Sequence, residues 1–141
     1  MRLLVVDGSE ILARTVKRLA PPGIEVHTLS SFREAMDSLL EDAPQALVVN
    51  ITHADLPWRD LQLRCRDHSP PIPVLFESSF YEDPAAAGLD DLGPRSVFLA
   101  KPYRLSDLRR EIRHLTRQAR LNLRRTAKSE DARPDATPKE P

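Results

Sequence analysis

Residues 45–57 read QALVVNITHADLP. The run Ala46–Val49 has the length and β-branched composition of a buried strand, and it ends at Asn50, where the chain turns polar. Three other stretches have the same form: RLLVVDG at 2–8, PVLFES at 73–78 and SVFLAK at 96–101. A more polar stretch, IEVHTL at 24–29, alternates as a half-buried strand does. The sequence therefore predicts five strands.

Segments with helical spacing separate these strands. Ser9 can cap a first helix, and Ser30 or Ser31 can begin a second. A third helix is expected around Asp60–Asp67, and a last one begins at Leu105. Apolar strands that alternate with amphipathic helices favour a parallel sheet covered on both faces. The predicted fold class is a doubly wound α/β domain.

The formal net charge of +0 hides an uneven distribution. Basic residues stand against acidic ones as 10 to 15 in residues 1–103 (−5), 9 to 2 in 104–128 (+7) and 2 to 4 in 129–141 (−2). The last segment has three prolines and no large apolar residue. We expect a folded domain over 1–115, a basic helical extension over 116–128 and a disordered tail over 129–141.

The composition excludes several classes of protein. Cys65 is the one cysteine, so there is no disulfide framework and no site built from paired thiolates. No apolar run approaches the roughly 18 residues of a membrane helix, and residues after Met1 show no signal-peptide pattern. We therefore expect a cytoplasmic protein with no membrane partner.

Polar residues stand where four of the predicted strands end. They are Asp7, Asn50, Ser78 and Lys101. In open parallel sheets, ligands gather at the carboxyl edge of the strands. The sequence therefore places its candidate site there.

The motifs LLVVDG, LVVN, PVLFES and FLAKPY together resemble the receiver domain of two-component response regulators, over about Arg2–Leu115. The resemblance implies a flavodoxin-like sheet with strand order 2-1-3-4-5. It also implies a chemistry in which a kinase histidine passes a phosphoryl group to an aspartate after the third strand. In that family an acidic pair after the first strand holds magnesium, while a Thr or Ser and a Lys bind the phosphoryl oxygens.

Matched residue by residue, the resemblance gives the Thr/Ser role to Ser78 and the lysine role to Lys101. The aromatic residue that changes rotamer in the family corresponds to Phe98. Asp7 supplies half of the acidic pair, but Gly8 stands where the second acid belongs. Asn50 stands at the phosphoacceptor position.

These departures remove the chemistry of the family. A carboxamide at Asn50 is no nucleophile, because its oxygen lone pairs are delocalised toward nitrogen. Magnesium prefers several oxygen ligands with more than one carboxylate or phosphate nearby, and Asp7 alone offers one. We predict no phosphorylation, no catalytic residue, no enzyme activity, no metal and no cofactor. Asp7, Gly8, Ser78 and Lys101 would remain as a pocket in which Asp7 pairs with Lys101, and Asn50 accepts from Lys101 and donates to Asp7.

Two features leave alternatives open. Glu77 stands at the end of the fourth predicted strand, where an apolar residue is expected. A one-residue shift in the register of this strand would bring the Glu77 carboxylate to the pocket side. The chain would then be a true phosphotransfer receiver using a non-standard acid. His53 and Asp55 suggest a metal site, against the plainer interpretation of a solvated loop.

Without a switch, the function has to reside in surfaces. The family docks and dimerises through its fourth helix, fifth strand and fifth helix, a face that here includes Phe98, Tyr103 and Leu105. Trp58 is a further interface candidate, although it can equally pack onto its own domain. We expect a protein-interaction module that binds a kinase, a regulator or a scaffold, or a homodimer through this face.

The basic last helix supports a second hypothesis, a regulator that binds nucleic acid. Its cationic residues are Arg109, Arg110, Arg113, Arg117, Arg120, Arg124, Arg125 and Lys128. No aromatic residue is interleaved with them, and charge alone is non-specific. A solvated or protein-binding helix is therefore the plainer interpretation.

Overall fold

The computed structural model describes residues 1–51 and 56–132. Its strands pair in parallel in the order β2-β1-β3-β4-β5, which confirms the expected fold class and strand order. The strands are β1 (Arg2–Val6), β2 (Glu25–Leu29), β3 (Ala46–Asn50), β4 (Val74–Ser78) and β5 (Ser96–Ala100).

Four helices connect and cover these strands: α1 (Glu10–Leu19), α2 (Phe32–Glu41), α3 (Trp58–Asp67) and α4 (Leu105–Ala132). The Ser9 hydroxyl accepts from the Ile11 amide at 3.3 Å and caps α1. Ser31, rather than Ser30, caps α2, because its hydroxyl accepts from the Glu34 amide at 3.1 Å.

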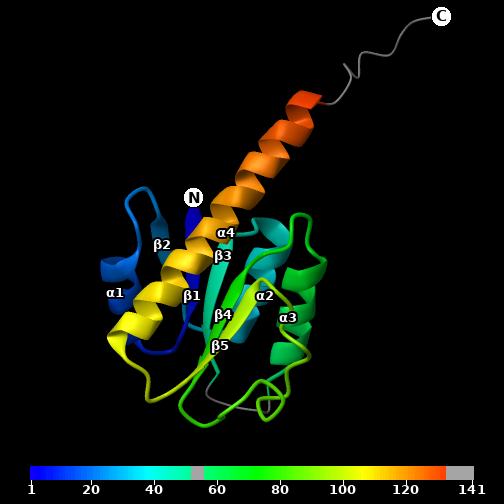
Figure 1. Ribbon diagram of the computed structural model, residues 1–141. Coiled ribbons are helices and arrows are strands. Elements are labelled where there is room, and N and C mark those ends of the chain that lie inside the picture. The colour runs from blue at the N-terminus through cyan, green and yellow to red at the C-terminus, as the bar shows by residue number, and fades with distance from the viewer. Residues whose placement is uncertain (52–55, 133–141) are drawn as a thin grey trace, which may run out of the picture.

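The sheet divides the apolar core into two layers. On one face, α1 and α4 pack Leu12, Val16 and Ile112 against the strands. On the other face, α2 and α3 pack Leu39 and Leu61. Figure 1 shows α4 lying across the sheet beside α1, with its orange and red end standing clear of the strands.

The β4–β5 connection lacks the helix that the resemblance to receiver domains implies between these strands. Residues 79–95, all of which the structure describes, contain turns but no helix. Gly88 and Gly93 adopt φ of 79° and 71°, which a continuous helix cannot accommodate. The Gln62 side chain fixes this segment instead, since it donates to the Asp90 carbonyl (2.9 Å) and accepts from the Asp90 amide (2.8 Å). The expected homodimer face therefore lacks its helical first element.

Helix α4 also changes the expected boundaries. Thr116, Ala119 and Asn122 are buried, so the packed domain extends past 115. The Asn122 amide donates to the Pro71 carbonyl at 2.8 Å, which ties the helix to the α3–β4 connection. The helix runs to Ala132, so the expectation of a disordered tail is wrong for residues 129–132, and residues 133–141 lie outside the described part.

Helix α4 has 28 residues but a strongly charged surface. Among the described residues, none of the helices combines the length and the apolar character that a bilayer-spanning helix requires.

Candidate functional site

Asp7, Asn50 and Glu77 form one row across three neighbouring strand ends. Val6 pairs with Val49, which places Asp7 beside Asn50, and Asn50 pairs directly with Glu77. Two residues earlier in each strand, Val5, Val48 and Leu75 belong to the core layer under α1 and α4. Because side chains alternate along a strand, the three polar residues point to that same face.

Asn50 donates to Asp7, as predicted. The distance from Asn50 Nδ2 to Asp7 Oδ1 is 3.1 Å, and the Ser9 amide donates to the same oxygen at 3.1 Å. Asn50 Oδ1 is buried and has no hydrogen-bond donor among the described residues. The expected hydrogen bond from Lys101 to Asn50 is therefore wrong.

Lys101 pairs with Glu77 rather than with Asp7. Its Nζ lies 3.2 Å from Glu77 Oε1, and the Glu77 side chain is 0% exposed while that of Lys101 is 38% exposed. Glu77 thus reaches the pocket side in the regular register, with no shift of β4. A buried carboxylate needs a partner. Leu99 is the β5 neighbour of Glu77, and Lys101, two residues after Leu99, lies on the same face of the sheet as Leu99 and Glu77.

Tyr103 provides the second partner of this carboxylate. Its hydroxyl donates to Glu77 Oε2. Burial, followed by the hydrogen bond and the negative charge of Glu77, raises the pKa of Tyr103 well above its ordinary value. The phenol stays protonated and remains a donor, so Glu77 is held from two sides by residues that follow β5.

The shifted pKa of Tyr103 predicts an alkaline loss of stability. The folded protein keeps this proton above about pH 10, where the unfolded chain loses it. The contribution of protonated Tyr103 to the free energy of unfolding is therefore complete below that pH, and it declines as the pH rises toward the pKa of Tyr103 in the folded protein. Tyr103→Phe should lower the free energy of unfolding by about 1–2 kcal/mol at pH 8, and the gap from wild type should narrow by pH 10.5 in urea titrations. The control is Tyr81→Phe; the same pH-dependent gap in that variant would contradict the assignment.

Ser78 does not join the row. It follows Phe76 on the opposite side of β4, and its hydroxyl donates to the Ile51 carbonyl at 2.9 Å. The same oxygen accepts from the amides of Phe80 and Tyr81, both at 3.1 Å. The expectation that Ser78 completes the pocket network is wrong, because its hydroxyl is used to shape the chain beyond β4.

Two hollows flank the Asp7–Asn50 pair. The larger, of 680 Å³, lies between α1 and the start of α4 and exposes Lys101 and Tyr103 beside Leu12 and Leu108. The smaller, of 500 Å³, opens toward the α2 side and includes Gly8 and Phe32. Asp7 and Asn50 line both hollows and therefore separate them at the carboxyl edge of the sheet.

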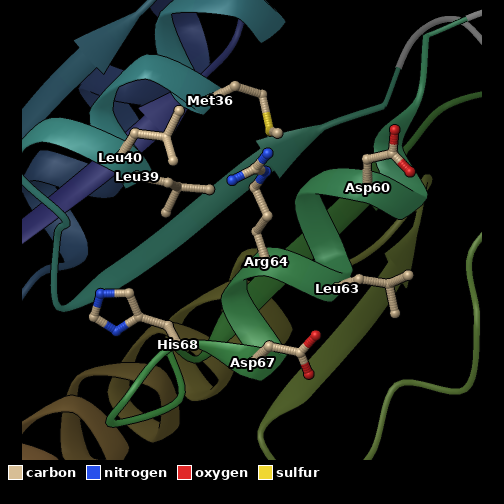
Figure 2. A pocket seen from close by; sticks show the side chains of 8 residues that line it. All are labelled: Met36, Leu39, Leu40, Asp60, Leu63, Arg64, Asp67 and His68. Atoms are coloured by element: carbon tan, nitrogen blue, oxygen red, sulfur yellow. The ribbon is translucent and has the colours of Figure 1, made fainter.

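A further hollow of 490 Å³ lies between α2 and α3. Figure 2 shows the Arg64 side chain extending toward Met36, while the carboxylates of Asp60 and Asp67 point in other directions. Its charged groups do not converge on one point, so this hollow has no arrangement that would orient a ligand.

The residues present do not fit the magnesium ion of the family. Asp7 is the one unpaired carboxylate at the row, and its Oδ1 already accepts two N–H groups. Gly8 offers no side-chain oxygen, and Glu77 is committed to Lys101 and Tyr103. In the described part of the chain, no three His, Cys, Asp or Glu side chains come together as a metal site. His53 and Asp55 lie outside the described residues.

The remaining candidates lie in different settings. Trp58 is 4% exposed, and its ring meets that of Phe32 edge-on with centroids 5.2 Å apart, so it packs into its own domain and is no exposed interface anchor. Phe98 is half-buried opposite Phe76, whereas Leu105 is exposed. Cys65 is buried, which raises the pKa of its thiol to about 12 and keeps it unreactive.

The basic residues of α4 divide into two groups. Arg110 forms ion pairs with Asp107 and Glu111, each at 3.3 Å. The others point to solvent; they are Arg109, Arg113, Arg117, Arg120, Arg124, Arg125 and Lys128.

Comparison with known proteins finds sequence similarity to response regulators. The chain is 34% identical over 123 residues to the transcriptional regulatory protein PrrA of Mycobacterium tuberculosis, a match that covers 83% of this chain and 50% of that protein. It is 32% identical over 138 residues to the response regulator MprA of Mycobacterium avium, covering 94% of this chain and 55% of that one. The chain thus spans about half the length of the curated relatives that it matches. No protein-family model matches it.

The fold is also that of solved receiver domains. The signal receiver domain of a Luxo repressor protein from Vibrio parahaemolyticus superposes with a TM-score of 0.67 at 22% identity, covering 86% of this chain and 95% of that one. At this identity the likeness concerns the fold alone.

Proposed function

Because the chain carries a receiver domain of the response-regulator type, we propose that it works without phosphorylation, as a protein-interaction module in two-component-type signal transduction. One observation carries this proposal. The lysine that would bind a phosphoryl oxygen is paired with an internal carboxylate, Glu77, at 3.2 Å. Glu77 therefore gives Lys101 the negatively charged partner that a phosphoryl group at the phosphoacceptor position would otherwise provide.

The phosphoacceptor position supports the same proposal. Asn50 holds Asp7 through its amide nitrogen, and a neutral amide cannot form an acyl phosphate. Asp7 and Glu77 with Lys101 leave a net charge near −1, which is too little to attract a divalent cation. Without that cation, the negative charge of a transferring phosphoryl group is not neutralised. The site would then have a single state in place of a switch, and its role would be binding rather than catalysis.

The rival proposal, phosphotransfer to Glu77, is disfavoured by its burial. Its side chain is 0% exposed, with one oxygen beside Lys101 and the other accepting from Tyr103. An attacking carboxylate needs access to phosphorus in line with the leaving group. The Glu77 carboxylate has no solvent contact, and its Oε1, which accepts no hydrogen bond among the described residues, is buried beside the Lys101 ammonium.

The test uses acetyl phosphate and magnesium on the purified full chain, followed by intact-mass measurement. We expect no phosphoryl adduct, and an amide NMR spectrum that beryllofluoride with magnesium leaves unchanged. A hydroxylamine-labile adduct would overturn the proposal, and mapping it to Glu77 would establish the rival. A cytoplasmic location and a kinase, regulator or scaffold as the partner stay predictions.

A further inference from the structure

Five arginines of α4 form a narrow band along one side of the helix. We call Arg109, Arg113, Arg117, Arg120 and Arg124 the arginine stripe. At 100° and 1.5 Å per residue, they fall within about 80° of arc and extend over about 22 Å. Between its two ends, this arc holds no other residue type. All five side chains are exposed.

The charge of the stripe is not neutralised by its surroundings. Among the described residues, none of the five forms an ion pair; Arg120 donates one hydrogen bond, to the Pro22 carbonyl at 3.0 Å. The two acids of this part of the helix, Asp107 and Glu111, lie outside the arc and pair with Arg110. Two shallow hollows of 360 and 290 Å³ follow the stripe, and no acidic residue lines either of them.

The position of the stripe leaves it accessible. The apolar face of α4, with Leu108, Ile112 and Ala119, is buried on the sheet. The stripe turns away from that face, and the helix stands clear of the domain at its far end (Figure 1). Residues 1–103 carry a net charge of −5. The rest of the domain would therefore repel a negatively charged polymer, and such a partner would bind at α4.

The chemistry of the stripe favours one kind of partner. Protein interfaces centre on aromatic or aliphatic anchors, and membrane-surface helices present a large apolar face; the arc has neither. Single-stranded nucleic acids need stacking aromatics, which are also absent from the arc. A line of guanidinium groups about 6 Å apart, each with paired N–H donors, matches the continuous phosphates of a duplex.

We propose that the arginine stripe binds the sugar-phosphate backbone of duplex DNA without reading its base sequence. The arc consists of arginines alone and has no Asn, Gln, Asp or Glu side chain with which to distinguish the other bases, so we expect its contacts to position the chain on DNA rather than to select a site. This binding is independent of the proposed loss of phosphorylation, and either can fail alone.

The experiment measures anisotropy of a labelled 20-base-pair duplex with the full chain between 50 and 200 mM salt. Five phosphate contacts predict a slope of about −4.5 in log affinity against log salt, a several-hundred-fold loss over that range. Arg113→Gln with Arg117→Gln should reduce the slope to about −2.7, while the corresponding double lysine variant should keep it near −4.5.

The matched control is Arg59→Gln with Arg64→Gln, an equal charge change on α3, across the sheet from α4. It should leave the slope unchanged, and an equal loss in both pairs would overturn the proposal. So would absence of duplex binding at 50 mM salt, more than tenfold preference between two unrelated duplexes, or tighter binding to anionic vesicles than to DNA.

Discussion

Lys101→Met should lower the free energy of unfolding by about 2–4 kcal/mol, the largest loss that we expect from one substitution outside the apolar core. The variant leaves the Glu77 carboxylate, 0% exposed, with the Tyr103 hydroxyl as its remaining partner. Removal of one member of a buried pair is costly because the other charge stays desolvated. Urea unfolding followed by circular dichroism measures the change.

The double variant Lys101→Met with Glu77→Gln tests the cause. Gln is neutral, so the double variant should be more stable than Lys101→Met alone, with a coupling energy of about 1–3 kcal/mol. Lys17→Met, on the exposed side of α1, is the matched control and should stay within about 0.5 kcal/mol of wild type. Equal stabilities for the single and double variants would show that the pair is not formed.

Rapid phosphorylation should require changes at three positions together. Asn50→Asp supplies the nucleophile but places it beside Asp7 with no metal to offset the two charges, so we expect a trace of adduct. Gly8→Asp adds the missing acid, and it fits, because nothing lies within 4 Å of a Cβ at Gly8 and its φ is ordinary. Glu77→Gln then frees Lys101. The triple variant should be labelled by acetyl phosphate on the order of 100-fold faster than Asn50→Asp, by intact-mass time courses.

The control for this series keeps the amide. Gly8→Asp with Glu77→Gln and native Asn50 should give no adduct, since it has the acids and the lysine but no nucleophile. If Asn50→Asp alone were labelled as fast as the triple variant, neither Gly8 nor Glu77 would contribute to the lack of phosphorylation that we propose for the wild type.

The sequence predicted the sheet because apolar runs of strand length between breakers leave few other arrangements. It also predicted the Asp7–Asn50 contact, since both residues end adjacent strands. It did not predict the partner of Lys101. Every residue of β4 is buried, so Glu77 had to be satisfied internally whichever face it occupied. The alternation of side chains along the strand puts Glu77 on the same face as Leu75. The pairing with Lys101 depended in addition on the β4–β5 register.

Ser78 and Trp58 show the other limit. Position along the chain puts Ser78 at a strand end, yet the side to which its hydroxyl turns depends on the backbone of 79–81. The burial of Trp58 depends on Phe32, which is 26 residues earlier and reaches it only through the packing of α2 on α3.

Helix α4 is anchored at Asn122 and continues without a break to Ala132, about 15 Å farther along its axis. It therefore fixes the angular phase of its far end relative to the sheet. Each residue inserted after Asn122 would rotate Ala132 by about 100° about the helix axis and advance it by about 1.5 Å. The number of residues between Asn122 and Ala132 therefore sets both the distance of the helix end from the sheet and the direction in which its side chains point.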